Sequence, residues 1–284
     1  LPLYSRGDSM DCFTSYSDVD SGTVTAGIFD LAVSGRGTIF GTRYNHNLAT
    51  VGNYQSKWVY GVDYKAYKSS LELFDVQLGN DITVHPISLG YQGTWVRVDG
   101  DANIGLALLH NIPGGSKGGQ RDFDLARAHA RDDYNALQFA TSITQILPQA
   151  WQLRAALKGQ YTKDALVPGE QFGAGGAASV RGFREREVSN DSGVVGNLEA
   201  YTPPLCLGGS WQCRALAFYD AGYLTRNHAL PGEFDHVSLS SAGLGVRLIY
   251  RRNLNLQVDY GHALHAEASE TQRGDDRLHV RLSL

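Results

Sequence analysis

Polar and apolar residues alternate with a period of two along much of this chain. Between Asn253 and Leu264, the odd positions carry asparagine, glutamine and aspartate, whereas the even positions carry mainly leucine, valine and tyrosine. From Arg277 to Leu284, arginine, histidine and serine alternate with leucine and valine in the same way. Because successive side chains of a β-strand point to opposite faces, this pattern predicts strands with one polar face and one apolar face.

The same alternation predicts twelve strands. They lie at about residues 9–18, 35–48, 55–67, 84–98, 101–111, 134–147, 150–162, 192–202, 211–224, 237–250, 252–264 and 276–284. Long charged residues occupy the polar faces, and aromatic residues stand near the ends of the apolar faces. A polar interior with an apolar, aromatic-edged outer wall is typical of membrane-spanning β-barrels.

The connections between these segments alternate in length. The long ones are expected at 19–34, 68–83, 112–133, 163–191, 225–236 and 265–275, and the short ones at 49–54, 98–101, 147–150, 203–210 and 250–253. Outer-membrane barrels have short periplasmic turns and long extracellular loops. The sequence therefore predicts an all-β fold, a transmembrane antiparallel up-and-down β-barrel in the bacterial outer membrane, with both chain ends on the periplasmic side.

Composition agrees with this class and excludes others. Charged residues make up 19%, against about 25% in soluble domains, and the chain holds 33 glycines and 15 tyrosines. No apolar run is long enough for a transmembrane helix. A net charge of -4 and a pI of about 6.1 exclude a strongly basic nucleic-acid binder, so no nucleic-acid partner is expected. The charged residues of the predicted lumen, among them Lys65, Arg154, Arg247 and Asp259, are expected to be mostly solvated.

Candidate chemistry is sparse. Cys206 and Cys213 flank one predicted turn and are compatible with a structural disulfide, with free thiols or with a redox or metal pair. The chain has no His-Glu-x-x-His or P-loop motif, and its nine histidines are scattered. We therefore expect no catalytic residue, no metal ligand and no cofactor, and we do not expect an enzyme.

The connection at 163–191 is the most informative segment. It is about 29 residues long, and loops beyond about 15 residues are usually functional. Residues 173–179 have almost no side-chain bulk and lead into Val180-Arg181-Gly182-Phe183. If the loop folds into the lumen, Arg181 needs a buried acceptor, because an unpaired buried charge is costly. Glu199 and Asp220 lie on later predicted strands and are the available acids.

These residues resemble the Omp85 superfamily. Val180-Arg181-Gly182-Phe183 is similar to the signature of its sixth extracellular loop, and Phe218-x-Asp220-x-Gly222 is similar to a motif on its thirteenth strand. The resemblance implies that the loop tip folds into the barrel and that Arg181 pairs with Asp220, with Glu199 as a further acceptor on the wall. Residues 15–22, 33–38 and 168–176 are most similar to the two-partner secretion (TpsB, haemolysin-activator-type) branch.

The resemblance also implies a domain organisation. The family barrel has about sixteen strands preceded by periplasmic POTRA domains, and the loop at 163–191 would make the first predicted strand here the fifth of the family. Residues 1–284 are therefore expected to be a partial barrel that lacks the POTRA domains and about four strands. The alternative is closure as twelve strands.

The implied function is secretion of a large unfolded exoprotein across the outer membrane. The expected partners are that exoprotein, outer-membrane lipid and the barrel assembly machinery that inserts the protein. Two other functions stay open, namely an Omp85-type factor that assembles or inserts other barrels, and a twelve-strand porin or membrane esterase. The pair of Arg181 and Asp220 would act as a conformational latch and not as a catalytic pair.

Overall fold

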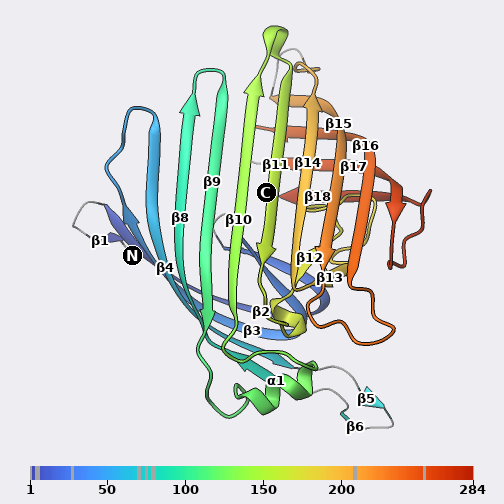
Figure 1. Cartoon of the computed structure of the whole chain (residues 1–284). Helices are drawn as coiled ribbons and strands as arrows, with labels where there is room; N and C mark the ends of the chain where they lie inside the picture. Colours follow the sequence, from blue (N-terminus) through green and yellow to red (C-terminus); the bar gives the residue numbers. More distant parts are fainter. Residues whose placement is uncertain are drawn as a thin grey trace.

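The computed structural model describes residues 2–3, 7–26, 29–68, 72–73, 76–77, 81–206, 210–251 and 254–283, and all twelve predicted strands are present (Figure 1). The long strands are β2 (Asp8–Ala26), β3 (Phe29–Asn47), β4 (Tyr54–Lys68), β8 (Pro86–Arg97), β9 (Gly100–Asn111), β10 (Asn135–Ile146), β11 (Gln152–Tyr161), β14 (Ser192–Tyr201), β15 (Trp211–Thr225), β16 (His236–Tyr250), β17 (Leu254–Ala266) and β18 (Asp276–Ser283). The short elements are β1 (Pro2–Leu3), β5 (Glu72–Leu73), β6 (Val76–Gln77), β7 (Ile82–Val84), β12 (Phe172–Ala174), β13 (Val188–Asn190), helix α1 (Gln120–Ala126) and the 3₁₀ turns Pro148–Ala150 and Pro168–Glu170.

The strands form one antiparallel, up-and-down sheet. Its order is β1-β2-β3-β4-β8-β9-β10-β11-β14-β15-β16-β17-β18, with the short β7 paired to β4. Each long strand therefore pairs with the next long strand along the chain, as the prediction requires. The sheet curls so that β2 and β3 lie behind β10 and β11 in Figure 1, which is the curvature of a barrel wall.

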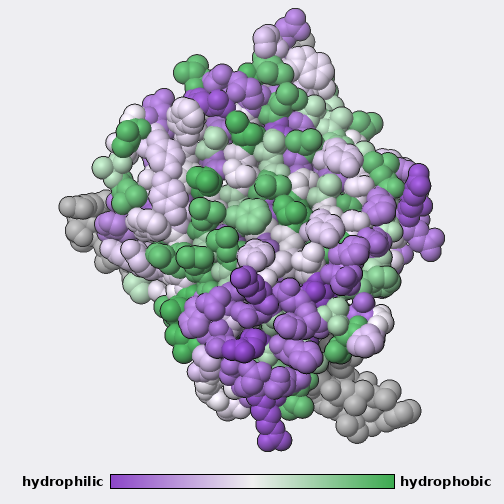
Figure 2. All heavy atoms as spheres, viewed as in Figure 1, coloured by the Kyte–Doolittle hydropathy of each residue, from purple (hydrophilic) through white to green (hydrophobic). Residues whose placement is uncertain are grey.

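The two faces of the wall have the opposite polarity to a soluble protein. Along β4, Val62 is 60% exposed, whereas its neighbours Asp63 and Lys65 are 5% and 4% exposed. On β9, Leu106 and Leu108 point outward in the same way. Figure 2 shows hydrophobic residues gathered over the strands and hydrophilic residues gathered around α1. Such an outer surface suits a hydrocarbon environment.

One predicted loop is wrong. Residues 19–34 were expected to be a long connection, but β2 continues to Ala26 and β3 starts at Phe29, with a register shift between Val19 and Gly22. Residues 27–28 lie outside the described residues. The added residues of β2 and β3 pair with each other, so their backbone N–H and C=O groups are satisfied. The two strands therefore extend where a loop was expected.

Several of the remaining long connections gather at the end of the wall that carries α1, the lower end in Figure 1. Phe123 of α1 is fully buried there, together with Leu166 and Val167 of loop 163–191 and Val84 of β7. None of the helices formed by the described residues is long and apolar enough to cross a membrane. The connection that leads into β7, the connection that carries α1 and loop 163–191 thus share an apolar core and hold one another in place.

Candidate functional site

Loop 163–191 leaves the wall at the end of β11 and returns to it at β14. Within the loop, β12 pairs with β13 as a separate two-stranded ribbon, with Phe172 opposite Asn190. Figure 1 draws this ribbon behind β14 and β15, on the concave side of the sheet. Residues 180–183, which we call the loop tip, lie beyond the ribbon and are buried against the inner face of the wall.

The alternation of side chains along β14 and β15 places the wall residues that contact the loop tip on one face. Asn197 and Glu199 share the inner face of β14, and Phe218, Asp220 and Gly222 share the inner face of β15. Asn197 lies directly opposite Asp220 in the register and donates its side-chain N–H to Asp220 Oδ1 at 2.8 Å. The Asp220 carboxylate is therefore oriented before any loop residue is considered.

Arg181 binds this face with its whole guanidinium. Its Nε donates to Asp220 Oδ2 at 2.7 Å, and its Nη2 donates to Asp220 Oδ1 at 2.8 Å. Its Nη1 donates to Glu199 Oε1 at 2.8 Å. The Cζ atom also lies 3.6 Å from the centroid of the Phe218 ring. A bidentate pair of this kind, stacked on an aromatic face, requires arginine rather than lysine.

The site is buried and nearly balanced in charge. Arg181 is 3% exposed and Asp220 is fully buried. Burial opposes the charged form of Arg181, but the hydrogen bonds and the attraction of Asp220 outweigh it and raise the pKa of the guanidinium. Arg154 binds Glu199 at 3.1 Å, and Arg247 binds Asp259 at 2.9 Å, so three guanidiniums face three carboxylates.

Apolar contacts fix the rest of the tip. Val180 and Phe183 are fully buried in a cluster that includes Val195 and Leu224 of the wall. A Cβ atom at Gly222 would stand 3.3 Å from Val180, so glycine leaves room for the valine. The structure thus brings together all four tip residues and the wall residues Glu199, Phe218, Asp220 and Gly222.

Gly182 makes the contact that the sequence did not suggest. Its φ of +93° is a conformation that glycine adopts freely, and it turns the tip backbone toward β17 and β18. A Cβ atom at Gly261 of β17 would stand 2.6 Å from the Gly182 nitrogen. That nitrogen donates to Nε2 of His279 on β18 at 3.0 Å. In the sequence, His279 is marked only by its place on the polar face of a predicted strand, and nothing there indicates a contact with the loop.

The sequence of this chain matches a known family over most of its length. The model of the haemolysin secretion/activation protein ShlB/FhaC/HecB family matches residues 8–248. The chain belongs to this family. The chain is also 31% identical over 148 residues to the outer membrane transporter CdiB of Dickeya dadantii (strain 3937), which covers 51% of this chain and 25% of the relative. The ShlB/FhaC/HecB family consists of transporters, and the chain is an outer-membrane protein, as predicted.

Solved structures share the fold. CdiB from Escherichia coli matches 98% of this chain and 50% of its own length, with a TM-score of 0.76 and 18% identity. CdiB from Acinetobacter baumannii matches 98% of this chain and 47% of its own, with a TM-score of 0.64 and 17% identity. A BamA from Haemophilus ducreyi lacking POTRA domains 1–3 gives a TM-score of 0.66 at 12% identity, with 100% and 60% of the two chains covered. The chain thus spans half or less of the CdiB proteins it matches.

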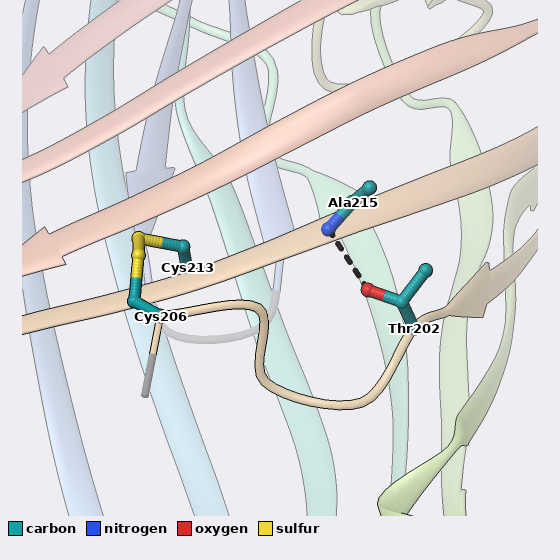
Figure 3. The surroundings of a disulfide bond; sticks show 4 residues. All are labelled: Thr202, Cys206, Cys213 and Ala215. Carbon is teal, nitrogen blue, oxygen red and sulfur yellow. Dashed lines mark hydrogen bonds between the residues drawn. A yellow bond between two sulfur atoms is a disulfide. The ribbon is translucent and has the colours of Figure 1, made fainter. Parts of the chain in front are cut away.

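Cys206 of the short turn after β14 forms a disulfide with Cys213 of β15 (Figure 3). Cys206 and Cys213 join the end of this turn to the start of β15, and Leu205 N–H donates to the Cys213 carbonyl at 2.8 Å. Nearby, Ala215 N–H donates to Thr202 Oγ1 at 3.1 Å. The bond lies in the β14–β15 connection and takes no part in the loop tip.

The charged groups around the loop tip pair with one another. Among the described residues, no group of three or more histidine, cysteine, aspartate or glutamate side chains is arranged to hold a metal ion. The three carboxylates of the site are each paired with arginine. The arrangement fastens a loop to a wall.

Proposed function

We propose that this chain forms the membrane-spanning conduit through which a two-partner secretion transporter exports one large, unfolded exoprotein. The family and the matching CdiB transporter support this function. The carrying observation is the buried pair of Arg181 and Asp220, because it fastens a long loop inside the polar lumen. A fastened loop that can be released would let the barrel stay shut between transport events.

A cavity beside the loop tip gives the conduit its chemistry. It has a volume of about 680 Å³ and is lined mostly by polar and charged residues of the wall and of loop 163–191, with a few alanines and with Leu157 and Ile249 among them. Arg154, Lys158, Arg247 and Arg281 line it together with Asn197 and Glu199. A polar lining suits an extended polypeptide, because the backbone groups of an unfolded substrate keep hydrogen-bonding partners during passage.

The outer surface and the fold indicate the other partners. The outward leucine, valine and tyrosine side chains would contact outer-membrane lipid. Insertion of such a barrel would require the barrel assembly machinery. The secreted exoprotein would enter from the short-turn end, which we take to be periplasmic, and would leave at the end that carries α1.

The latch is tested by replacing Arg181 with alanine and measuring secretion of the cognate exoprotein by the intact transporter. We expect secretion to fall at least about tenfold, because Asp220 and Glu199 would lose a guanidinium that makes three strong hydrogen bonds. Heat-modifiable gel mobility would report whether the barrel is still folded and inserted.

Arg184→Ala is the matched control. Arg184 lies on the same loop, and its side chain is 59% exposed and pairs with the exposed Glu270. We expect this variant to secrete like the wild type. Normal secretion by Arg181→Ala would overturn the latch, and a general defect in outer-membrane protein assembly would favour the assembly-factor function instead.

A further inference from the structure

The loop tip is bound to the last strand of the sheet as well as to β15. The Gly182 N–H donates to His279 Nε2 at 3.0 Å, and His279 is half-buried on the inner face of β18. This contact is separate from the pair of Arg181 and Asp220, because it uses the tip backbone and a different strand. It joins loop 163–191 to the strand at the end of the sheet order.

The contact requires one protonation state of the imidazole. A neutral histidine carries a proton on one ring nitrogen and accepts a hydrogen bond at the other. Because Nε2 accepts from Gly182, the proton of the neutral ring lies on Nδ1. In the protonated imidazole both nitrogens carry hydrogen, so Nε2–H would face the Gly182 N–H and no hydrogen bond could form. Protonation therefore breaks this contact outright.

Four charged groups surround the imidazole ring of His279. Arg181 and Glu185 face it from the loop, Arg277 from β18 and Asp259 from β17, where Asp259 is its partner in the register. Two of these groups are cations and two are carboxylates. A free imidazole titrates near about pH 6.5.

The tip has little other backbone support on this side. Gly182 and Gly261 approach without side chains between them, and the Ser241 hydroxyl beside Gly182 is buried without a hydrogen-bond partner in the described structure. The hydrogen bond to His279 is therefore the specific polar contact that the Gly182 backbone makes with β16–β18. Loss of this hydrogen bond would release the backbone of the loop tip and would leave the pairing between the wall strands unchanged.

We propose that His279 is a pH-sensitive positioning residue, whose neutral imidazole holds the loop tip on β18 and whose protonation releases it. This role regulates the latch of the proposed function and rests on that function for its consequence. Acid would then raise the fraction of time for which the loop tip is away from the wall and the conduit conducts.

The test is the conductance of the intact transporter in planar bilayers bathed in KCl, measured from pH 8 to pH 5. For the wild type we expect the open fraction to rise about tenfold as the pH falls through the imidazole range, as loss of one well-placed hydrogen bond would give. His279→Gln keeps an acceptor that does not titrate in this range. We expect this variant to stay closed at every pH.

A second variant removes the acceptor altogether. His279→Leu should be as open at pH 8 as the wild type is at pH 5, and its open fraction should not change with pH. His262→Gln is the control, because His262 is an exposed histidine of β17 that binds Asp276 at 2.8 Å, and this variant should follow the wild type. A pH response that survives in His279→Gln would overturn the proposal, as would a closed His279→Leu at pH 8.

This proposal and the proposed function can fail separately. If Arg181→Ala secretes normally while the pH response still depends on His279, the secretion latch is wrong and the histidine contact stands. If Arg181→Ala loses secretion while conductance ignores both His279 variants, the latch stands and the role of His279 is wrong. Gel mobility of both His279 variants would show that each barrel is folded.

Discussion

The two ends of loop 163–191 are both held by buried ion pairs, but the partners differ. At the tip, Arg181 reaches carboxylates on the wall strands. We define the loop base as residues 164–171 and 190–191. There Asp191 is fully buried and accepts hydrogen bonds from both terminal nitrogens of Arg127, which lies in the neighbouring loop. It also accepts the backbone N–H of Leu166 at 2.8 Å and of Asn227 at 2.6 Å.

A second buried carboxylate fixes the base to the opposite wall. Glu170 accepts Lys65 Nζ of β4 at 2.9 Å, the Tyr67 hydroxyl at 2.7 Å and the Tyr134 hydroxyl at 2.8 Å. Since β8, β9 and β10 separate β4 from β11 in the sheet, the base reaches across the lumen. Burial and the neighbouring Glu170 hold the pKa of Tyr134 well above its usual range, so this phenol stays a donor.

The difference indicates which end can move. Asp191 binds residues of three separate connections, so its release would disturb several loops at once. The tip is held by close glycine contacts, by the Arg181 guanidinium and by the His279 acceptor, and its release would leave the ribbon and the base in place. We infer a loop with a fixed base and a releasable tip.

Replacing Asp191 with alanine should have the largest effect on stability. It leaves Arg127, whose side chain is 10% exposed, without its counter-charge and two backbone N–H groups without an acceptor, for which we expect a loss of about 3–5 kcal/mol of unfolding free energy. Denaturant unfolding followed by gel mobility would measure the loss. Asp235→Ala, at an exposed carboxylate of the β15–β16 loop, should show no measurable change. Equal unfolding midpoints for Asp191→Ala and Asp235→Ala would contradict the inference that the loop base is fixed.

Glu170→Gln should have the next largest effect and should lower the unfolding free energy by about 2–4 kcal/mol. The reason is that Lys65 is 4% exposed and would lose its counter-charge. The double variant Lys65→Met with Glu170→Gln should recover most of that loss, since a neutral pair of similar volume avoids the buried charge. The same unfolding measurement applies. No recovery in the double variant would show that the charge pair is not what holds the base.

Strand positions could be predicted from alternation because the period of two is set by backbone geometry alone. The pairing of Arg181 with Asp220 followed from motifs that resemble a known family, and not from spacing. The depth of the tip could not be predicted, since it depends on tertiary packing. Lys65 and Asp259 were therefore expected to be solvated wall residues, whereas they are 4% and 5% exposed.

The base escaped prediction for a related reason. Arg127, Asp191 and Asn227 lie far apart in the sequence and meet only because three long connections pack at one end of the wall. No periodicity marks such residues. His279 shared its alternating face with two arginines, and its contact with Gly182 depends on the positive φ of that glycine.

Gly261→Ala should have the smallest effect on stability and should act on the tip alone. The new Cβ atom would stand 2.6 Å from the Gly182 nitrogen and would push the tip off β17, at a cost of about 1–3 kcal/mol for overpacking. We therefore expect a raised open fraction at pH 8 with the base intact. Gly196→Ala is the control, since its Cβ atom would meet Leu157 at an ordinary 3.6 Å. If Gly261→Ala leaves the conductance unchanged, the tip does not close the conduit, and the contrast between a fixed base and a releasable tip fails.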